Sequence, residues 1–448
     1  MKRTSYIIIL ICMLCTGDLF AQSGMRFPEL SKKLEAYFAD ELIQDIHDEL
    51  PDNDSYQIWG WDVGDFSGDG YYDLALTVKF LRDKRKIMQV YLFVDNDGFI
   101  SKVGQFPYEY FELPLEIGVS IKQNACFVTK KRKQFDWVIK GYRFDNGALI
   151  LLDDFQTYRQ NQYTVEKHKN YSTCVSETKY ILTSNNNTVF EAKYVTIPSY
   201  ERGRTVYKGY ANSVSTSFPE FVFDGAFYYQ GDEDAKYDIR SNFDSENLYF
   251  SINIADDEVV STRCDTCCGD NIELWFDFYP LLTGQDRLLK DVTKGKKINP
   301  RSEADTSIYS ITFSPGDFLE IPPFVKGVKS TDSVSLEQKL AVNRIKIVTA
   351  LNKSGYNLKL KIPFEVFGID LYPAEEMVST DIGFTLIVND IDNEFRPEET
   401  ARIATSQFNQ KIPASFGELT LIPTGMWYGE AENVYHDEIL KLLNENGF

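Results

Sequence analysis

The alternation of apolar and polar residues predicts that most of this chain is β-structure. The clearest case lies between Asp244 and Phe278, where two alternating runs flank an acidic loop that carries cysteines. The apolar sides of these runs are Leu248, Phe250, Ile252 and Ile254, and then Ile272, Leu274, Phe276 and Phe278. A period of two is typical of a strand with one buried face. About ten such runs follow Phe218, which predicts two packed antiparallel sheets.

The polar side of the second run is unusual because it places an aromatic ring between two carboxylates. Glu273, Trp275 and Asp277 alternate there with the apolar positions. A ring beside hydrogen-bonding groups is typical of a ligand-binding wall. The alternative is that a loop covers Trp275 as ordinary packing.

The region before residue 200 is predicted to contain one helix and then an antiparallel β domain. From Phe27 to Leu50 an apolar residue recurs about every fourth position, which is typical of an amphipathic helix. The run from Ile87 to Val94 is apolar on both faces and predicts a central strand. Asn146-Gly147 separates two apolar runs, which predicts a hairpin turn.

These patterns divide the chain into five parts. They are a signal peptide (residues 1–21), a helix plus β-rich domain (22–200), a polar linker (201–215), a β-sandwich (216–424) and a helical tail (425–448). The tail helix is expected from Asn433 to Leu443, where apolar residues form one stripe. The predicted fold class is therefore mostly β.

The N-terminus has the pattern of a secretory signal peptide. Lys2 and Arg3 precede an apolar run, and cleavage is expected after Ala21. The protein is therefore expected to be exported and to be periplasmic, cell-surface or extracellular. Lipoprotein anchoring through Cys15 is the alternative, although Leu14 stands where a small residue is expected. No later run reaches the ~20 apolar residues of a membrane span.

Charge narrows the range of partners. The 448 residues include 47 Lys plus Arg and 67 Asp plus Glu, for a net charge of -20. Such a surface repels phosphate backbones, so nucleic acid is excluded as a partner. Asp256, Asp257 and Asp270 crowd one predicted loop, where either a cation or solvent screens their repulsion.

Five of the 7 cysteines lie beyond the signal peptide. Export favours disulfides, and our hypothesis pairs Cys126 with Cys174, and Cys264 with either Cys267 or Cys268. Zinc is the alternative for the last three, but the second half of a structural zinc site is missing from the sequence.

The segment after Trp59 has the spacing of a calcium loop. Asp65, Ser67, Asp69, Tyr71 and Asp73 occupy positions 1, 3, 5, 7 and 9, with a glycine at position 6. This spacing brings hard oxygens to one point, which suits structural Ca²⁺. The loop runs directly into an alternating strand, and in this it resembles the FG-GAP repeat of integrin-type propellers, which implies bound calcium. An Asp/Gly turn without metal is the alternative.

Residues 216–424 resemble the carbohydrate-binding module family 9-like domains. The resemblance is carried by the opening stretch and by four further motifs: Phe223–Gly225, Ile362–Gly368, Gly383–Asp392 and Phe416–Leu421. It implies a β-sandwich that holds an oligo- or polysaccharide between aromatic rings. Trp275 with Glu273 and Asp277 would form one wall of the cleft, and Tyr228 and Tyr229 the other.

The sequence thus predicts an exported carbohydrate-binding protein without catalytic residues. No motif selects a pair of catalytic carboxylates, and if the protein were an enzyme, hydrolysis of a xylan-like polysaccharide would be expected. Two alternatives remain open at this stage. They are an envelope scaffold that binds protein partners without sugar, and an accessory module of a polysaccharide hydrolase system.

Overall fold

A computed structural model describes residues 56–80, 87–95, 100–109, 116–133, 136–145, 147–201, 214–215, 218–260, 269–283, 307–330, 336–369, 380–422 and 433–434. The signal peptide and the predicted helix from Phe27 to Leu50 lie outside these residues. None of the described helices reaches the length and apolarity that a membrane-spanning helix requires.

The chain forms two compact units. Unit 1 comprises residues 1–168, 207–209 and 425–448, and unit 2 comprises residues 169–206 and 210–424. Residues 169–206 therefore belong with the second unit and not, as the sequence suggested, with the first domain. The reason is strand pairing, because β11 (Asn187–Glu201) pairs in parallel with both β13 (Lys236–Phe243) and β22 (Gly417–Ile422).

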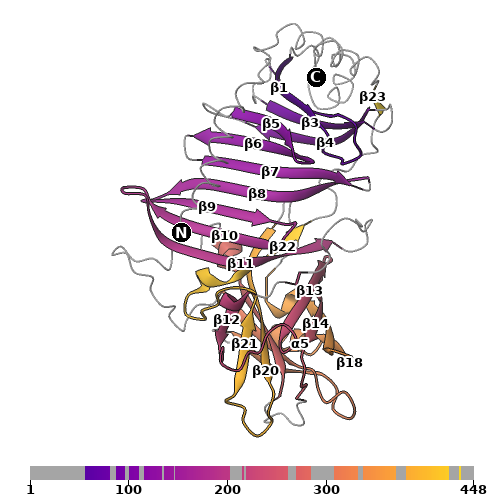
Figure 1. Cartoon of the computed structure of the whole chain (residues 1–448), viewed down its shortest axis with the longest axis vertical. Coiled ribbons are helices and arrows are strands. Elements are labelled where there is room, and N and C mark those ends of the chain that lie inside the picture. The colour runs from indigo at the N-terminus through magenta and orange to yellow at the C-terminus, as the bar shows by residue number, and fades with distance from the viewer. Residues whose placement is uncertain are drawn as a thin grey trace. The chain divides into compact units, whose positions relative to one another are not determined.

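Unit 1 contains a five-stranded antiparallel sheet in the order β1-β2-β3-β4-β23 (Figure 1). Its strands are β1 (Tyr56–Gly64), β2 (Asp73–Phe80), β3 (Ile87–Asp95), β4 (Ile100–Glu109) and β23 (Asn433–Val434). The prediction that the run from Ile87 is a central strand is confirmed. The predicted tail helix is wrong at its start, because Asn433 and Val434 pair with Ser101 and Ile100. The rest of that helix lies outside the described residues.

A second set of strands in unit 1 runs as an antiparallel meander. It comprises β5 (Glu116–Lys122), β6 (Ala125–Lys133), β7 (Asp136–Asp145) and β8 (Ala148–Gln160), followed by β9 (Tyr163–Asn170). Asp145 pairs with Ala148 across the β7–β8 turn. The predicted hairpin at Asn146-Gly147 is therefore confirmed.

Unit 2 is a β-sandwich (Figure 1). Besides β11, β13 and β22, its described elements are β10 (Val175–Leu182), η1 (Pro219–Phe221), β12 (Val222–Asp224), β14 (Asn247–Ala255), β15 (Asn271–Asp277), α3 (Tyr279–Thr283), β16 (Ile308–Ser314), β17 (Phe324–Ser330), α5 (Leu336–Val342), β18 (Lys346–Asn352), β19 (Gly355–Pro363), η2 (Phe364–Val366), β20 (Thr380–Ile391), β21 (Thr400–Ala404) and η3 (Pro413–Ser415). The first layer has the strand order β18-β19-β14-β13, and the second layer has the order β17-β16-β15-β20-β21-β12.

The core of unit 2 lies between these layers. The two apolar rows predicted from the sequence, on β14 and β15, are both buried in it. Phe250 of one layer stacks on Phe384 of the other, with ring centroids 5.4 Å apart and planes 6° apart. The inward faces are thus occupied by packing, and polar side chains of β15, β20 and β21 are left on the outer face.

Candidate functional site

A row of polar side chains crosses the outer face of the second layer of unit 2. Asp224 of β12 lies opposite Arg402 of β21, which lies opposite Asn389 of β20. Asn389 in turn lies opposite Asn271 of β15. Since directly opposed residues of paired strands point to the same face, the register alone aligns four polar side chains from four strands.

Glu273 joins this row through a network of hydrogen bonds. Arg402 donates from Nε to Asn389 Oδ1 (2.7 Å) and from Nη2 to Glu273 Oε1 (3.0 Å). Asn389 donates from Nδ2 to Glu273 Oε1 (2.9 Å) and to Asn271 Oδ1 (2.8 Å). Charge-assisted bonds of this kind hold planar side chains in one orientation.

The row is open to solvent at its Asp224 end. The side chains of Arg402 and Asp224 are 29% and 66% exposed, and Arg402 Nη1 lies 3.9 Å from Asp224 Oδ2, too far for a direct hydrogen bond. The Arg402 guanidinium also lies over the ring of Phe223, 4.9 Å from its centroid. A polar group of a ligand therefore has room to bridge Arg402 and Asp224.

Trp275 does not form the open wall that the sequence suggested. Its side chain is 5% exposed and packs against Phe408 and Phe416, at centroid distances of 5.4 and 6.2 Å. Its Nε1 donates to Glu273 Oε2 over 2.8 Å. The covered alternative is the correct one, because residues 405–416 bring apolar side chains over the indole. Trp275 thus supports Glu273 from beneath.

Asp277 also differs from its expected role as a ligand contact. It is 1% exposed, and its Oδ1 accepts hydrogen bonds from the Tyr279 backbone N–H (3.0 Å) and from Ser307 Oγ (3.1 Å). These bonds fix the start of the short helix α3 and the loop that precedes β16. Asp277 is therefore a structural residue, whereas Glu273 keeps a place at the surface.

Tyr228 and Tyr229 lie in the loop between β12 and β13, both half-buried. The Tyr229 ring packs against the core, and its hydroxyl lies 3.4 Å from Asp232 Oδ1. The Tyr228 ring meets Phe227 edge to face at 5.7 Å. Of the two predicted rings, Tyr228 is the one that contacts an exposed aromatic side chain.

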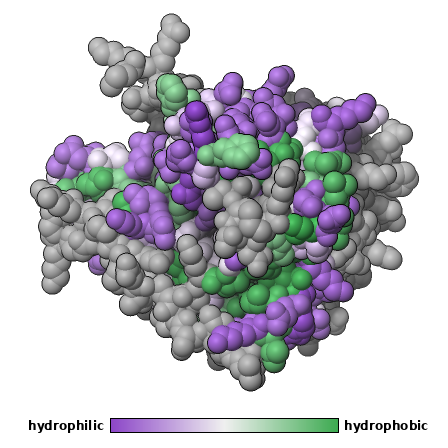
Figure 2. All heavy atoms as spheres, turned by 90° about the horizontal axis from the view of Figure 1, so that it is seen from below, coloured by the Kyte–Doolittle hydropathy of each residue, from purple (hydrophilic) through white to green (hydrophobic). Residues whose placement is uncertain are grey.

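Two exposed aromatic residues were not predicted from the sequence. Phe227 is 94% exposed and Phe395 is 85% exposed, and Figure 2 shows hydrophobic side chains at the surface among hydrophilic ones. Gly225, two residues before Phe227, lies against β21: it has φ 65°, and a Cβ there would lie 1.8 Å from Thr400 O. Only glycine fits this close approach. The exposure of the Phe227 ring becomes visible only in the structure, which is why the sequence did not single it out.

The predicted calcium loop connects β1 to β2 in unit 1. Asp73 Oδ2 accepts hydrogen bonds from the backbone N–H groups of Phe66 (2.7 Å) and Ser67 (2.8 Å), and Asp69 Oδ1 accepts one from Tyr71 (2.9 Å). Asp65 likewise accepts bonds from Ser67 Oγ and from the N–H groups of Gly68 and Gly70. In the part of the chain that the structure describes, two other groups bring three carboxylates within 4.8 Å, and this loop is not one of them.

Cys126 and Cys174 are both free and buried, so the proposed disulfide between them is not formed. Each thiol is held by local structure: Cys126 lies in β6, and Cys174 Sγ lies 3.5 Å from Tyr171 O in the turn before β10. Burial raises the pKa of Cys174 to about 11, which keeps it a thiol at neutral pH. Cys264 and Cys267 lie outside the described residues.

Comparison with known proteins gives structural likeness only. No family model and no curated protein matches the chain. A family 9 carbohydrate-binding module from Caldicellulosiruptor kristjanssonii, in complex with cellotriose, is 14% identical over 51% of this chain and 95% of the module, with a TM-score of 0.29. The structure of such a module from the same organism in complex with glucose is 13% identical over 52% of this chain and 100% of the module, with a TM-score of 0.30.

A protein from Bacteroides uniformis that is proposed to bind carbohydrate is 10% identical, over 50% of this chain and 98% of that one, with a TM-score of 0.31. These TM-scores are too low to assign a function. Any assignment depends on the side chains of unit 2.

Proposed function

We propose that unit 2 is a non-catalytic module that binds a saccharide on the outer face of its second layer. The observation that carries the proposal is the hydrogen-bonded network of Glu273, Asn389 and Arg402. Sugars offer neighbouring hydroxyl groups, and a few fixed planar side chains suit their recognition. The resemblance of residues 216–424 to family 9-like modules supports the same function.

The apolar side of a sugar ring needs an aromatic partner, and Trp275 is covered. Phe227 is the candidate, because it is almost fully exposed and Gly225 holds its loop against β21, next to Arg402. The packing of an exposed ring against a pyranose removes apolar surface of both from water. The site would thus combine the polar row with Phe227.

The way Glu273 is bonded supports binding without catalysis. Its oxygens accept hydrogen bonds from Trp275, Asn389 and Arg402. A general acid or a nucleophile must exchange a proton or form a bond during the reaction. A carboxylate tied to three donors is suited to orientation instead.

The proposal extends to the setting of the protein. Export to the periplasm, the cell surface or the medium would bring the module to polysaccharides, and calcium held by Asp65, Ser67, Asp69, Tyr71 and Asp73 would stiffen the first unit. The motif spacing of the loop and the signal-like N-terminus support these two points.

Protein binding is a second candidate because of strand β18. Within the described residues β18 pairs only with β19, and its Val348 and Leu351 are 62% and 56% exposed. A strand with a free edge and exposed apolar side chains can pair with another chain. This feature fits an envelope scaffold.

The test compares saccharide binding by wild-type protein and two variants. Arg402→Ala should weaken binding on a glycan array and in affinity gels by tenfold or more, because a hydrogen bond to a charged group contributes about 1.5–3 kcal/mol. Arg240→Ala, an exposed position on β13 in the other layer, should bind as the wild type does. Failure of the wild type to bind xylan, cellulose or host glycans, together with capture of an envelope protein, would favour the scaffold.

A further inference from the structure

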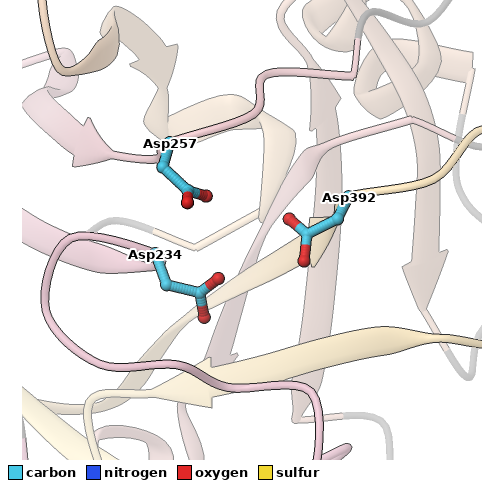
Figure 3. A group of neighbouring side chains, drawn as sticks. All are labelled: Asp234, Asp257 and Asp392. Carbon is cyan, nitrogen blue, oxygen red and sulfur yellow. The ribbon is translucent and has the colours of Figure 1, made fainter.

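Three loops of unit 2 bring three carboxylates together. Asp234 precedes β13, Asp257 follows β14 and Asp392 follows β20. One oxygen of each lies within 4.8 Å of the others, and Figure 3 shows the three carboxylates directed toward a common space. Such a group is an acidic cluster only, unless a second observation points to a ligand.

The second observation is a buried oxygen that has no hydrogen-bond partner. Asp234 is 3% exposed, and its Oδ2 accepts a bond from the Gln230 backbone N–H over 2.7 Å. Its Oδ1 is buried and has no hydrogen-bond partner among the described residues, and the same holds for Oδ1 of Asp392. A buried acceptor without a donor costs about 1–3 kcal/mol, and more when it is charged. Two such atoms in one cluster call for a positive charge between them.

No cationic side chain in the described residues supplies this positive charge. Lys236, on the strand that follows Asp234, pairs with Asp232 over 2.7 Å. Within the described residues, no salt bridge reaches Asp234, Asp257 or Asp392. Asp257 is exposed, so the cluster is reached from solvent.

A second acidic cluster lies next to the first but is already satisfied from within the protein. It consists of Asp256, Asp270 and Asp390, all buried. Both oxygens of Asp270 accept backbone bonds, from Ile391 (3.0 Å) and Val260 (2.6 Å). Asp256 Oδ1 accepts the Glu258 backbone N–H over 2.9 Å. Because Asp256 and Asp270 have hydrogen-bond partners within the chain and all three side chains are buried, this inner cluster is not our candidate for a cation.

We propose that Asp234, Asp257 and Asp392 bind one Ca²⁺ ion. Calcium bonds to oxygen are about 2.3–2.6 Å long, so oxygens across one ion lie up to roughly 4.6–5.2 Å apart. The three carboxylate oxygens all lie within this span, so one ion can reach all of them. Magnesium demands a near-ideal octahedral arrangement and is usually held by only one or two carboxylates, whereas three carboxylates on separate loops suit calcium. Water would complete the coordination on the exposed side of Asp257.

The ion would connect the loops that carry the exposed rings. Phe227 lies in the loop that ends at Asp234, and Phe395 lies three positions after Asp392. A bound ion would therefore fix both loops at one end of the sandwich. The proposal does not depend on a saccharide, because it concerns a different set of side chains.

The test uses the full exported chain, freed of metal by a chelator, and CaCl₂ as the probe. Calorimetry and the thermal unfolding midpoint of unit 2 should both report binding. Asp257→Asn removes one negative charge from the ligand set at an exposed position, and so should fold normally and bind Ca²⁺ at this site at least about tenfold more weakly. Asp392→Asn should have the same effect. Asp232→Asn, in the loop of Asp234, is the control and should bind Ca²⁺ like the wild type.

Asp69→Ala distinguishes calcium bound by the predicted loop of unit 1 from calcium bound by the unit 2 cluster, because it changes the loop and leaves the cluster intact. The proposal is overturned if CaCl₂ leaves the unfolding midpoint of unit 2 unchanged. It is also overturned if Asp257→Asn and Asp392→Asn bind Ca²⁺ with unchanged affinity and stoichiometry, or if Mg²⁺ binds the cluster as tightly as Ca²⁺.

Discussion

Two groups of carboxylates in unit 2 differ in whether the chain supplies their compensating charge. In one place Lys169, which is 4% exposed, reaches Asp381 Oδ2 at 2.6 Å and Glu418 Oε1 at 2.5 Å. Thr420 and Tyr194 add hydrogen bonds to the same two carboxylates. In the other place, Asp234, Asp257 and Asp392 meet with no described salt bridge and with two unpartnered oxygens.

The comparison shows how a protein can leave a charge to be supplied from outside. Carboxylates packed together repel each other unless protons or a cation compensate them. At β9, β20 and β22 the chain provides the ammonium group, and that cluster is complete once the protein folds. At the loop end of the sandwich the compensating charge must come from solution, so its occupancy depends on the medium.

The largest expected effect comes from removing the internal cation. Lys169→Met leaves Asp381 and Glu418 uncompensated and should lower the free energy of unfolding of unit 2 by about 3–5 kcal/mol. Denaturant unfolding followed by fluorescence measures this. Lys236→Met removes an exposed ion pair and should cost less than about 1 kcal/mol. Equal losses of unfolding free energy in the two variants would show that Lys169 and its carboxylates stabilise unit 2 no more than the exposed ion pair does.

The next effect concerns the external cation. Calcium at about a hundred times its Kd should raise the free energy of unfolding by about 2.7 kcal/mol, and a chelator should reverse this. Without calcium, Asp392→Asn should be as stable as the wild type or more so, because it removes repulsion. Opposite signs for Lys169→Met and metal-free Asp392→Asn would confirm the contrast, and a large loss in both would contradict it.

The smallest effect is a difference in pH dependence. Burial alone would lower the pKa of Lys169, but Asp381 and Glu418 raise it well above its usual range. For Asp381, burial acts to raise the pKa, yet Lys169 lowers it overall. The stability that depends on the ionised Asp381 is therefore present at neutral pH and lost as the pH falls through its lowered pKa.

The pH effect is measured as the difference in thermal midpoint between wild type and Lys169→Met, from about pH 7 to about pH 3. This difference should shrink on acidification. It should be small, because the Asp381 side chain is 41% exposed and solvent screens it. A constant difference in thermal midpoint across this range would show that ionised Asp381 does not contribute to this stability.

Much of the sandwich could be predicted from local pattern. The alternation on β14 and β15 is visible in neighbouring residues, and every predicted inward residue of those strands is buried. What covers Trp275 could not be predicted, because Phe408 and Phe416 come from a distant segment of the sequence. The pairing of Cys126 with Cys174 failed for a similar reason, since spacing in the sequence does not reveal which strands carry each thiol.

The candidate sites were only partly visible in the sequence. Asp256, Asp257 and Asp270 were noted as a crowded acidic loop, but they divide into two clusters that are completed by distant residues: Asp390 in one, and Asp234 and Asp392 in the other. Glu273 was identified from its place on the polar side of β15. Arg402 and Asn389 were missed, because only the register of β20 with β21 makes them neighbours of Glu273.

The fluorescence of the covered Trp275 indole can report binding at the polar row. Trp275 is the single tryptophan within residues 169–206 and 210–424, and its ring nitrogen bonds to the Glu273 carboxylate that also holds Arg402. A ligand bound at Arg402 would change the polarity around that nitrogen, and the part of the protein's fluorescence that comes from Trp275 should shift in wavelength.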